Sequence, residues 1–290
     1  MELFDGFARG LVAAVLMLAL LFGAGTLSAA GANQQDGSVV ALAYDSGTDT
    51  LVKASARALY RSADGGESWQ ETPIAAFEDG QIASVAASPA SKGVMYVARP
   101  GFGVLRSDNA GKTWADRNEG LPNRDVVAVA AHTTQPDTVY VVVKEHGVFR
   151  SQDAGKNWRL MDRSSQEGLR QLIHSDLPGS MQTGWLFAAT AKGIRRVMDC
   201  FCLWQDAGKL GTQAYGVTYD ATRPEHIYAA TEKGLFRSAD GGEDWVAMTS
   251  PSPKVIAIAF THSGSLFVIN ASGDLYRSDD QGGTWKQVNA

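Results

Sequence analysis

From residue 38 onward, short apolar segments alternate with polar turns. Five segments place small or apolar side chains at every second position, namely 38–45, 81–88, 125–132, 213–220 and 254–261. Each is followed by a second apolar run and then by a third segment such as "GVFRS" at 147–151. A period of two is typical of β-strands with two different faces. Beyond residue 37 the pattern therefore predicts an all-β chain.

A nine-residue phrase follows each third strand and leads into a fourth. It reads "RSADGGESW" at 61–69, and aligning its copies on tryptophan gives steps of 45, 44, 46, 41 and 40 residues. A period in the forties is the length of a four-stranded propeller blade. We therefore predict a single six-bladed β-propeller of four-stranded antiparallel blades over residues 38–290, with each blade contiguous in sequence.

The repeated phrase has a structural explanation. Its acidic residue can accept hydrogen bonds from backbone N–H groups two or three residues on, which stabilises a tight turn. Its glycine supplies the positive φ of such turns, and its tryptophan packs on the neighbouring blade. The predicted structural positions are Asp64, Asn109, Asp153, Asp199, Asp240 and Asp280, with Trp69, Trp114, Trp158, Trp204, Trp245 and Trp285.

These copies resemble the Asp box, Ser-x-Asp-x-Gly-x-Thr-Trp, also called the bacterial neuraminidase repeat. The resemblance covers residues 38–290 and implies a propeller similar to those of sialidases, xyloglucan hydrolases, sortilin-type receptors and photosystem II assembly factors. The same fold carries hydrolases, receptors and assembly chaperones, so the resemblance alone does not select a function.

The fourth copy, "RVMDCFCLW", departs from the pattern. It keeps Asp199 and Trp204 but has Phe201 where the glycine belongs, with Cys200 and Cys202 on either side. One interpretation is a disulfide between residues i and i+2 with a redox or metal role. The preferred one is a degenerate turn with two small apolar residues. Accordingly, we expect Asp199→Ala to cost less stability than Asp240→Ala.

The first 37 residues form a different segment. No charge occurs from Gly10 to Gln35, and Leu11 to Phe22 is an unbroken apolar run. We predict that residues 1–32 are a secretory signal peptide or a transmembrane anchor through residues 8–29, followed by a linker at 33–37. Either alternative places the propeller outside the cytoplasm, in the periplasm or at the outer surface of the inner membrane.

Composition and motifs limit which partners and which kinds of active site can be expected. A formal net charge of -5 argues against a nucleic-acid partner. Sialidases have an Arg-Ile-Pro element early in the fold and bind a carboxylate with three arginines. The nearest match to that element here is Arg99 followed directly by Pro100, without the central residue. The sequence shows no nucleophile–base pair and no acid pair suited to glycoside hydrolysis. His132, His174 and His262 follow first strands at no metal-ligand spacing. We expect no catalytic residues, metal or cofactor.

The hairpins between second and third strands carry a basic bias. They and their immediate neighbours hold seven cations, against the carboxylates of Glu145 and Glu232. The proposed binding residues, which include one histidine, are Lys53, Arg57, Arg99, Lys144, His146, Lys192, Arg195 and Lys233. This pattern suggests a non-enzymatic interaction or assembly module for a membrane-protein partner. The alternative is a glycan-binding or glycan-hydrolysing propeller of the sialidase type.

Overall fold

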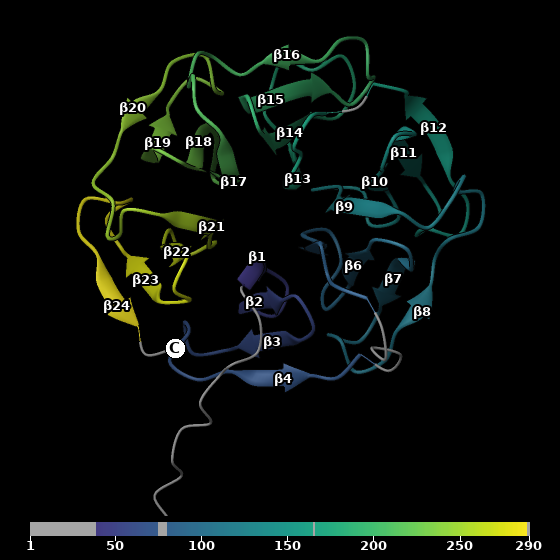
Figure 1. Ribbon diagram of the computed structural model, residues 1–290, viewed down its shortest axis with the longest axis horizontal. Helices are drawn as coiled ribbons and strands as arrows, with labels where there is room; N and C mark the ends of the chain where they lie inside the picture. The colour runs from purple at the N-terminus through teal and green to yellow at the C-terminus, as the bar shows by residue number, and fades with distance from the viewer. Residues whose placement is uncertain (1–38, 75–79, 165, 289–290) are drawn as a thin grey trace, which may run out of the picture. The chain divides into compact units, whose positions relative to one another are not determined.

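The computed structural model describes residues 39–74, 80–164 and 166–288, in which the regular secondary structure is entirely β (Figure 1). Twenty-four strands form six separate four-stranded antiparallel sheets, and each sheet uses four strands that are consecutive in the chain. None of these described residues forms a helix long and apolar enough to cross a membrane. The predicted signal peptide or anchor and the linker at 33–37 lie outside the described residues.

Within each blade, the four strands follow one another in chain order from the axis outward. Blades 1 to 3 comprise β1 (Val39–Asp45), β2 (Thr50–Ser55), β3 (Leu59–Ser62) and β4 (Gln70–Thr72); β5 (Ser84–Ala87), β6 (Met95–Arg99), β7 (Gly103–Ser107) and β8 (Ala115–Asp116); β9 (Val126–Ala131), β10 (Val139–Val143), β11 (Gly147–Ser151) and β12 (Arg159–Asp162). Blades 4 to 6 comprise β13 (Gln171–Ser175), β14 (Trp185–Thr190), β15 (Gly193–Met198) and β16 (Gln205–Asp206); β17 (Ala214–Asp220), β18 (Arg223–Thr231), β19 (Gly234–Ser238) and β20 (Val246–Ala247); β21 (Val255–Phe260), β22 (Leu266–Asn270), β23 (Leu275–Ser278) and β24 (Lys286–Val288).

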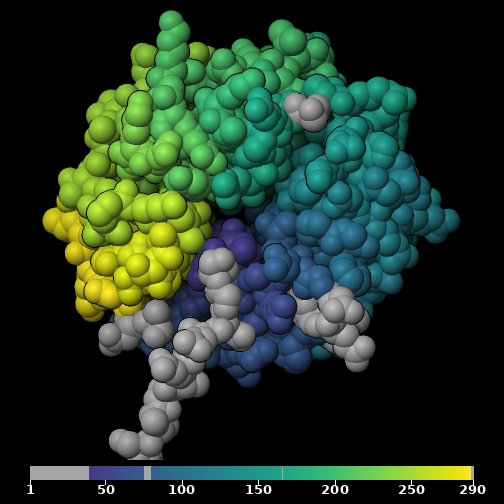
Figure 2. Space-filling view, in the orientation of Figure 1, coloured from purple at the N-terminus to yellow at the C-terminus, as the bar shows by residue number. Residues whose placement is uncertain are grey.

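The six sheets close into a ring within the compact unit of residues 36–290. The inner strands β1, β5, β9, β13, β17 and β21 contact one another in succession, and β21 contacts β1 to complete the circle. In the space-filling view the ring is hollowed at its centre (Figure 2). The predicted six-bladed propeller is confirmed. The last blade completes its sheet with its own strand β24, so the ring closes by packing between blades 6 and 1.

The hydrophobic core is divided among the six junctions between blades. Each buried cluster combines residues of two adjacent blades. Tyr96 and Tyr140, at matching positions of β6 and β10, are each 1% exposed. Between such large side chains lie the small ones of the inner strands, for example Ala128 and Ala130. A strand near the axis has little room, so the alanines of the repeat fit this place.

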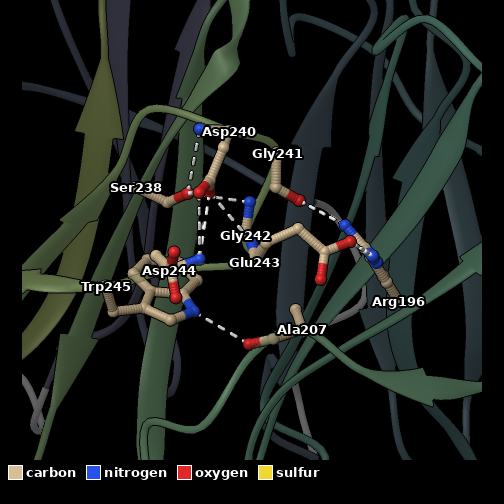
Figure 3. Close-up of polar contacts among 9 residues, drawn as sticks. All are labelled: Arg196, Ala207, Ser238, Asp240, Gly241, Gly242, Glu243, Asp244 and Trp245. Atoms are coloured by element: carbon tan, nitrogen blue, oxygen red, sulfur yellow. Dashed lines mark hydrogen bonds and ion pairs between the residues drawn. The ribbon is translucent and has the colours of Figure 1, made fainter.

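Figure 3 shows a regular Asp-box turn, that of blade 5. Asp240 Oδ1 accepts hydrogen bonds from the Ser238 hydroxyl (2.6 Å) and from Asp244 N (3.0 Å). Ser238 Oγ in turn accepts one from Gly242 N at 2.8 Å. Gly242 has φ 93°, a left-handed conformation that costs glycine little. Trp245 Nε1 donates to the carbonyl of Ala207 at 2.8 Å, which ties the turn to the preceding linker.

Four other turns share this arrangement. In each, the box serine accepts a hydrogen bond from the glycine N–H four residues on; the pairs are Ser62–Gly66, Ser107–Gly111, Ser151–Gly155 and Ser278–Gly282. The pKa of Asp64 is lowered to about 2 because its carboxylate accepts hydrogen bonds, of which those from Ser68 have the largest effect. Asn109 accepts from Thr113 N in the same way (2.9 Å), so its amide replaces the carboxylate.

The turn of blade 4 follows a different path. Val197 stands in place of the serine, so no hydroxyl is present to accept the bond. Phe201 N instead donates to the carbonyl of Met198 at 2.8 Å, and Cys200 and Cys202 form a disulfide. Asp199 is 1% exposed and points inward, where its Oδ2 accepts hydrogen bonds from Thr183 N (2.9 Å) and the Thr183 hydroxyl. Asp199 therefore stabilises the β13–β14 connection and not its own turn.

Candidate functional site

The propeller has two faces with different loops. The hairpin face carries the loops between second and third strands and the linkers between blades, and the Asp-box face carries the remaining turns. A cavity of about 580 Å³ at the hairpin face is lined by the beginnings of inner strands, including Val39, Val127 and Ile256. A second cavity, of about 460 Å³, is lined by their other ends, including Ala131 and Phe260. These two cavities are the mouths of the central channel.

Five of the proposed binding residues lie exposed in hairpin loops. They are Arg57, Lys144, His146, Lys192 and Lys233. The same loops also hold Glu145, Glu232 and Asp274, the last of which the count from the sequence left out. Lys192 pairs with Glu167 of the adjoining linker at 3.1 Å. Positive and negative charges are thus nearly balanced in the hairpin loops, which is a weaker basic bias than the sequence suggested.

The other three proposed residues are engaged within the propeller. Lys53 is 5% exposed and its Nζ lies 4.3 Å from the centre of the Trp69 ring, while burial lowers its pKa. Arg99 is 2% exposed and stacks 4.5 Å from the Phe102 ring. Arg195 donates to Gln166 Oε1 (3.0 Å) and to the carbonyl of Trp204 (3.1 Å). Their contacts stabilise blades 1, 2 and 4.

A compact basic site lies at the hairpin-face mouth of the channel. Arg170 and Lys254, both exposed, come from the linkers that lead into blades 4 and 6. Their charged groups lie 5.3 and 5.9 Å from the centre of the Tyr215 ring. With the Gln213 amide assigned the orientation that satisfies its hydrogen bonds, its oxygen accepts from Arg170 Nε (3.1 Å) and Nη2 (3.3 Å), which orients the guanidinium. Apolar residues, among them Val40, Leu169 and Ile256, form the rest of the lining.

Reasoning from the sequence missed Arg170 and Lys254 because it considered the hairpins and not the linkers. Both residues directly precede inner strands, β13 and β21. In blades 2, 4 and 6 the residue before the inner strand, namely Ala83, Arg170 or Lys254, lines the hairpin-face mouth. This position in the repeat was therefore a usable signal.

The opposite mouth is mainly apolar. Its lining includes Tyr44, Tyr219 and Phe260, with His174 and the exposed His262 at its edge. Burial raises the pKa of Tyr219, so its hydroxyl stays protonated. Within the described part of the chain, neither lining contains an aspartate or glutamate. Glycoside hydrolysis by two carboxylates has no such pair at either mouth.

Beside this mouth, His132, His174 and Asp199 come together between blades 3 and 4. Their nearest ligand-type atoms lie within 4.8 Å of one another, and the two imidazole rings stack at 3.8 Å. All three side chains are buried. Burial lowers the pKa of His132 to about 4 and that of His174 to about 3. Both rings are therefore neutral at neutral pH.

Hydrogen bonding shows how this cluster is used. Nδ1 of His132 accepts from the backbone N–H groups of Thr134 and Gln135, both at 3.1 Å. Its proton therefore resides on Nε2, which donates to Thr183 Oγ1 at 2.8 Å, and Thr183 donates to Asp199. A metal-ligating histidine normally donates its second ring N–H. Because two N–H groups face Nδ1 here, His132 fits a polar network between blades better than a metal site.

Several solved structures resemble this propeller. Among solved structures, YCF48 from Cyanidioschyzon merolae is 16% identical, with a TM-score of 0.56 and coverage of 87% of this chain and 85% of that one. YCF48 bound to a D1 peptide gives 16% identity and a TM-score of 0.57, with coverage of 87% and 82%. The Niastella koreensis GH74 enzyme gives 17% identity and a TM-score of 0.59. At this level of sequence identity, the similarities show a common fold and nothing more specific.

The coverage of the GH74 enzymes is partial. The alignment includes 86% of this chain but only 46% of the Niastella koreensis enzyme, and 31% of an ancestral GH74 enzyme. Among curated protein sequences, none matches this chain.

Family models give the more specific result. The BNR-Asp box repeat model matches residues 275–288, in the last blade. The model described as photosynthesis system II assembly factor YCF48 matches residues 32–183, which is more than half of the 290 residues. The chain therefore belongs to the YCF48 photosynthesis system II assembly factor family.

Proposed function

We propose that this protein is a non-enzymatic assembly module that binds an acidic segment of a protein partner at the hairpin-face mouth of its channel. The observation that carries the proposal is the placement of Arg170 and Lys254 beside Tyr215 in a cavity whose other lining residues are apolar. Two cations in an open cavity attract carboxylates, and a half-buried aromatic ring offers apolar contact beside them. Gln213 holds one guanidinium in place and so lowers the cost of ordering it.

Family membership supports a protein partner. A structural neighbour in the same family was solved with a D1 peptide bound. For the present chain we propose a partner that is a membrane protein or a membrane complex. A glycan ligand at one of the two mouths is the competing outcome, since GH74 enzymes share the fold.

We further propose that the propeller works outside the cytoplasm. The uncharged stretch from Gly10 to Gln35 is suited to export or anchoring. The Cys200–Cys202 disulfide supports the same location, because disulfides persist mainly in oxidising compartments. Fractionation of cells that express the full chain tests this, and recovery in the cytoplasmic fraction would contradict it.

Binding is tested by reversing charge at the mouth. The full chain and its Arg170→Glu/Lys254→Glu variant are used to capture complexes from solubilised membranes of the native host. In parallel, fluorescence anisotropy measures binding of a glutamate-rich peptide and of its glutamine counterpart. We expect a defined membrane complex and glutamate-dependent binding with the natural sequence only. Binding should weaken as salt is raised, because the charges are exposed.

The matched control reverses two exposed lysines of the Asp-box face, Lys112 and Lys156. Lys112→Glu/Lys156→Glu changes the net charge by the same amount and should leave capture and peptide binding unchanged. Equal losses in both variants would show a general charge effect and would overturn the assignment to this mouth. If a glycan panel gives binding or hydrolysis while no protein is captured, the protein belongs to the other functional class.

A further inference from the structure

The fourth Asp-box turn differs from the other five in chemistry as well as in path. A regular turn is stabilised by hydrogen bonds to a serine hydroxyl and to a carboxylate or amide oxygen. In blade 4 the sulfur atoms of Cys200 and Cys202 are bonded across Phe201, with Cα atoms 5.5 Å apart. These are the two cysteines of the chain. In blade 4 a disulfide therefore takes the place of these hydrogen bonds. Unlike them, a disulfide can be reduced.

The disulfide is accessible. Cys202 is exposed and Cys200 is half-buried. Next to it, Leu203 is 76% exposed, and Met181 of the β13–β14 connection is 74% exposed. The two loops are joined, because Asp199 N donates to the carbonyl of Gly184 at 3.1 Å. Exposed apolar side chains therefore accompany an exposed disulfide on the Asp-box face, and they offer contact area to a protein that approaches its sulfur atoms.

Phe201 carries backbone strain. Its φ is 57°, in the left-handed region, whereas the five regular boxes have glycine at this position with φ from 83° to 94°. A side chain with a Cβ is disfavoured there. The sulfur bridge joins the residues on both sides of Phe201, and we expect its opening to let this residue relax toward a negative φ. Reduction is thereby favoured over that of an unstrained disulfide.

Opening the bridge should leave the propeller folded. It closes a loop of only three residues, and short loops restrict the unfolded chain least. The turn keeps its backbone hydrogen bond from Phe201 N to Met198, and Asp199 keeps its bonds to Thr183. We therefore expect the bridge to contribute only a small part of the stability of the propeller.

We propose that Cys200–Cys202 is a redox-active disulfide that exchanges with a protein dithiol while the propeller remains folded. One thiolate of the dithiol attacks the exposed sulfur of Cys202. The Cys200–Cys202 bond breaks, and its electron pair leaves on Cys200, which takes up a proton. The second thiol of the dithiol, as its thiolate, attacks the mixed disulfide and releases the Cys202 thiolate. Two electrons pass to the propeller, and the dithiol becomes a disulfide.

The first test compares native and unfolded protein. The full chain is incubated with dithiothreitol, with or without urea, quenched in acid and alkylated, and mass spectrometry counts the free thiols. We expect two thiols to appear together in the native protein, at a rate within about tenfold of the unfolded rate, because the exposed sulfur needs no unfolding for attack. Circular dichroism and tryptophan fluorescence should report a folded propeller throughout. Reduction only in urea, or reduction accompanied by unfolding, would show a structural bridge and overturn the proposal.

The second test addresses the strain at Phe201. Phe201→Gly removes the Cβ, and we expect its disulfide to be roughly fivefold to thirtyfold harder to reduce at equilibrium, the range given by the cost of a left-handed residue. Phe201→Leu keeps the Cβ and should match the natural protein. Equal reduction constants for the glycine and leucine variants would contradict the proposal even if the natural bridge is reducible.

Discussion

Arg196 of blade 4 donates a hydrogen bond through Nη1 to the carbonyl oxygen of Gly241 in the Asp-box turn of blade 5, at 2.7 Å. It also pairs with Glu243 of the same turn (Figure 3). Arg196 is 7% exposed and its guanidinium lies 5.0 Å from the Trp185 ring centre. The recurrent arginine of the repeat can therefore connect one blade to the next.

Replacing Arg196 should destabilise the junction between blades 4 and 5. Arg196→Leu leaves the buried carbonyl of Gly241 without this donor, and we expect the free energy of unfolding to fall by about 2 kcal/mol. Arg237, the matching residue of blade 5, is exposed. Arg237→Leu should change the unfolding free energy by less than about 0.5 kcal/mol. Urea denaturation measures both, and equal effects would contradict the role given to Arg196.

The structure leads us to expect the opposite order of stability losses for two aspartate substitutions from the order expected from the sequence. Asp240 is exposed and stabilises a surface turn, so Asp240→Ala should cost about 1 kcal/mol. Asp199 is buried and accepts two hydrogen bonds from Thr183, so Asp199→Ala should cost about 3 kcal/mol. Thermal and urea denaturation of the two variants check this. A smaller loss at Asp199 would support the expectation from the sequence.

The stacked histidines predict loss of stability in mild acid. The folded pKa values of His132 and His174, about 4 and about 3, lie below the ordinary value of 6.5. The unfolded chain therefore binds protons first as the pH falls below about 6.5, and folding loses stability from there down to the folded pKa values. Between pH 7 and pH 5 we expect a loss of about 2 kcal/mol for each ring.

The histidine effect is measured by urea unfolding at both pH values. His174→Gln should reduce the difference between pH 7 and pH 5 by about half. A variant with the full pH dependence of the natural protein would show that His174 is not a buried neutral ring. The Asp-box carboxylates titrate in a separate window, since their stabilising effect is lost only as the pH falls from about 4 toward about 2.

Two glycines form a matched pair for backbone effects. Gly147 begins β11 with φ 98°, and an added Cβ would lie 2.0 Å from the carbonyl oxygen of Asp162. Gly264 has φ 88° and open space around the added atom. Gly264→Ala should cost only conformational strain, about 1 kcal/mol. Gly147→Ala must also displace backbone, and we expect about 3 kcal/mol or more. Similar melting temperatures for the two variants would contradict this difference.

The sequence predicted the fold because each blade carries the same information. Six tryptophans at steps of 40 to 46 residues define the blade boundaries, and period-two alternation locates the strands. The hairpin "KEHG" at 144–147 was placed correctly because the flanking valines define both strands. The path of the fourth turn was not predictable beyond its deviation, since Asp199 finds its partner in Thr183, 16 residues earlier.

The candidate site was less predictable for a physical reason. A charge count along the chain does not show which side chains pack inward. Lys53 and Arg99 read as surface cations, yet both lie against aromatic rings inside the propeller. Arg170 and Lys254 are 84 residues apart and lie near the same Tyr215 ring only because the inner strands of blades 4, 5 and 6 pack side by side around the channel. Their proximity depends on tertiary structure.

The junction between blades 6 and 1 has a mechanical consequence. Every other pair of neighbouring blades is joined by a chain segment that follows the fourth strand, but β24 and β1 lie at opposite ends of the described chain. This junction therefore depends on side-chain packing, with Leu42, Phe267 and Leu275 in its core. When the ring opens transiently, we expect the opening to begin at this junction, because no chain segment joins its two blades. Amide hydrogens of β1 and β21 would then exchange sooner than those of β9 and β13, and the bore of the channel would widen on one side only.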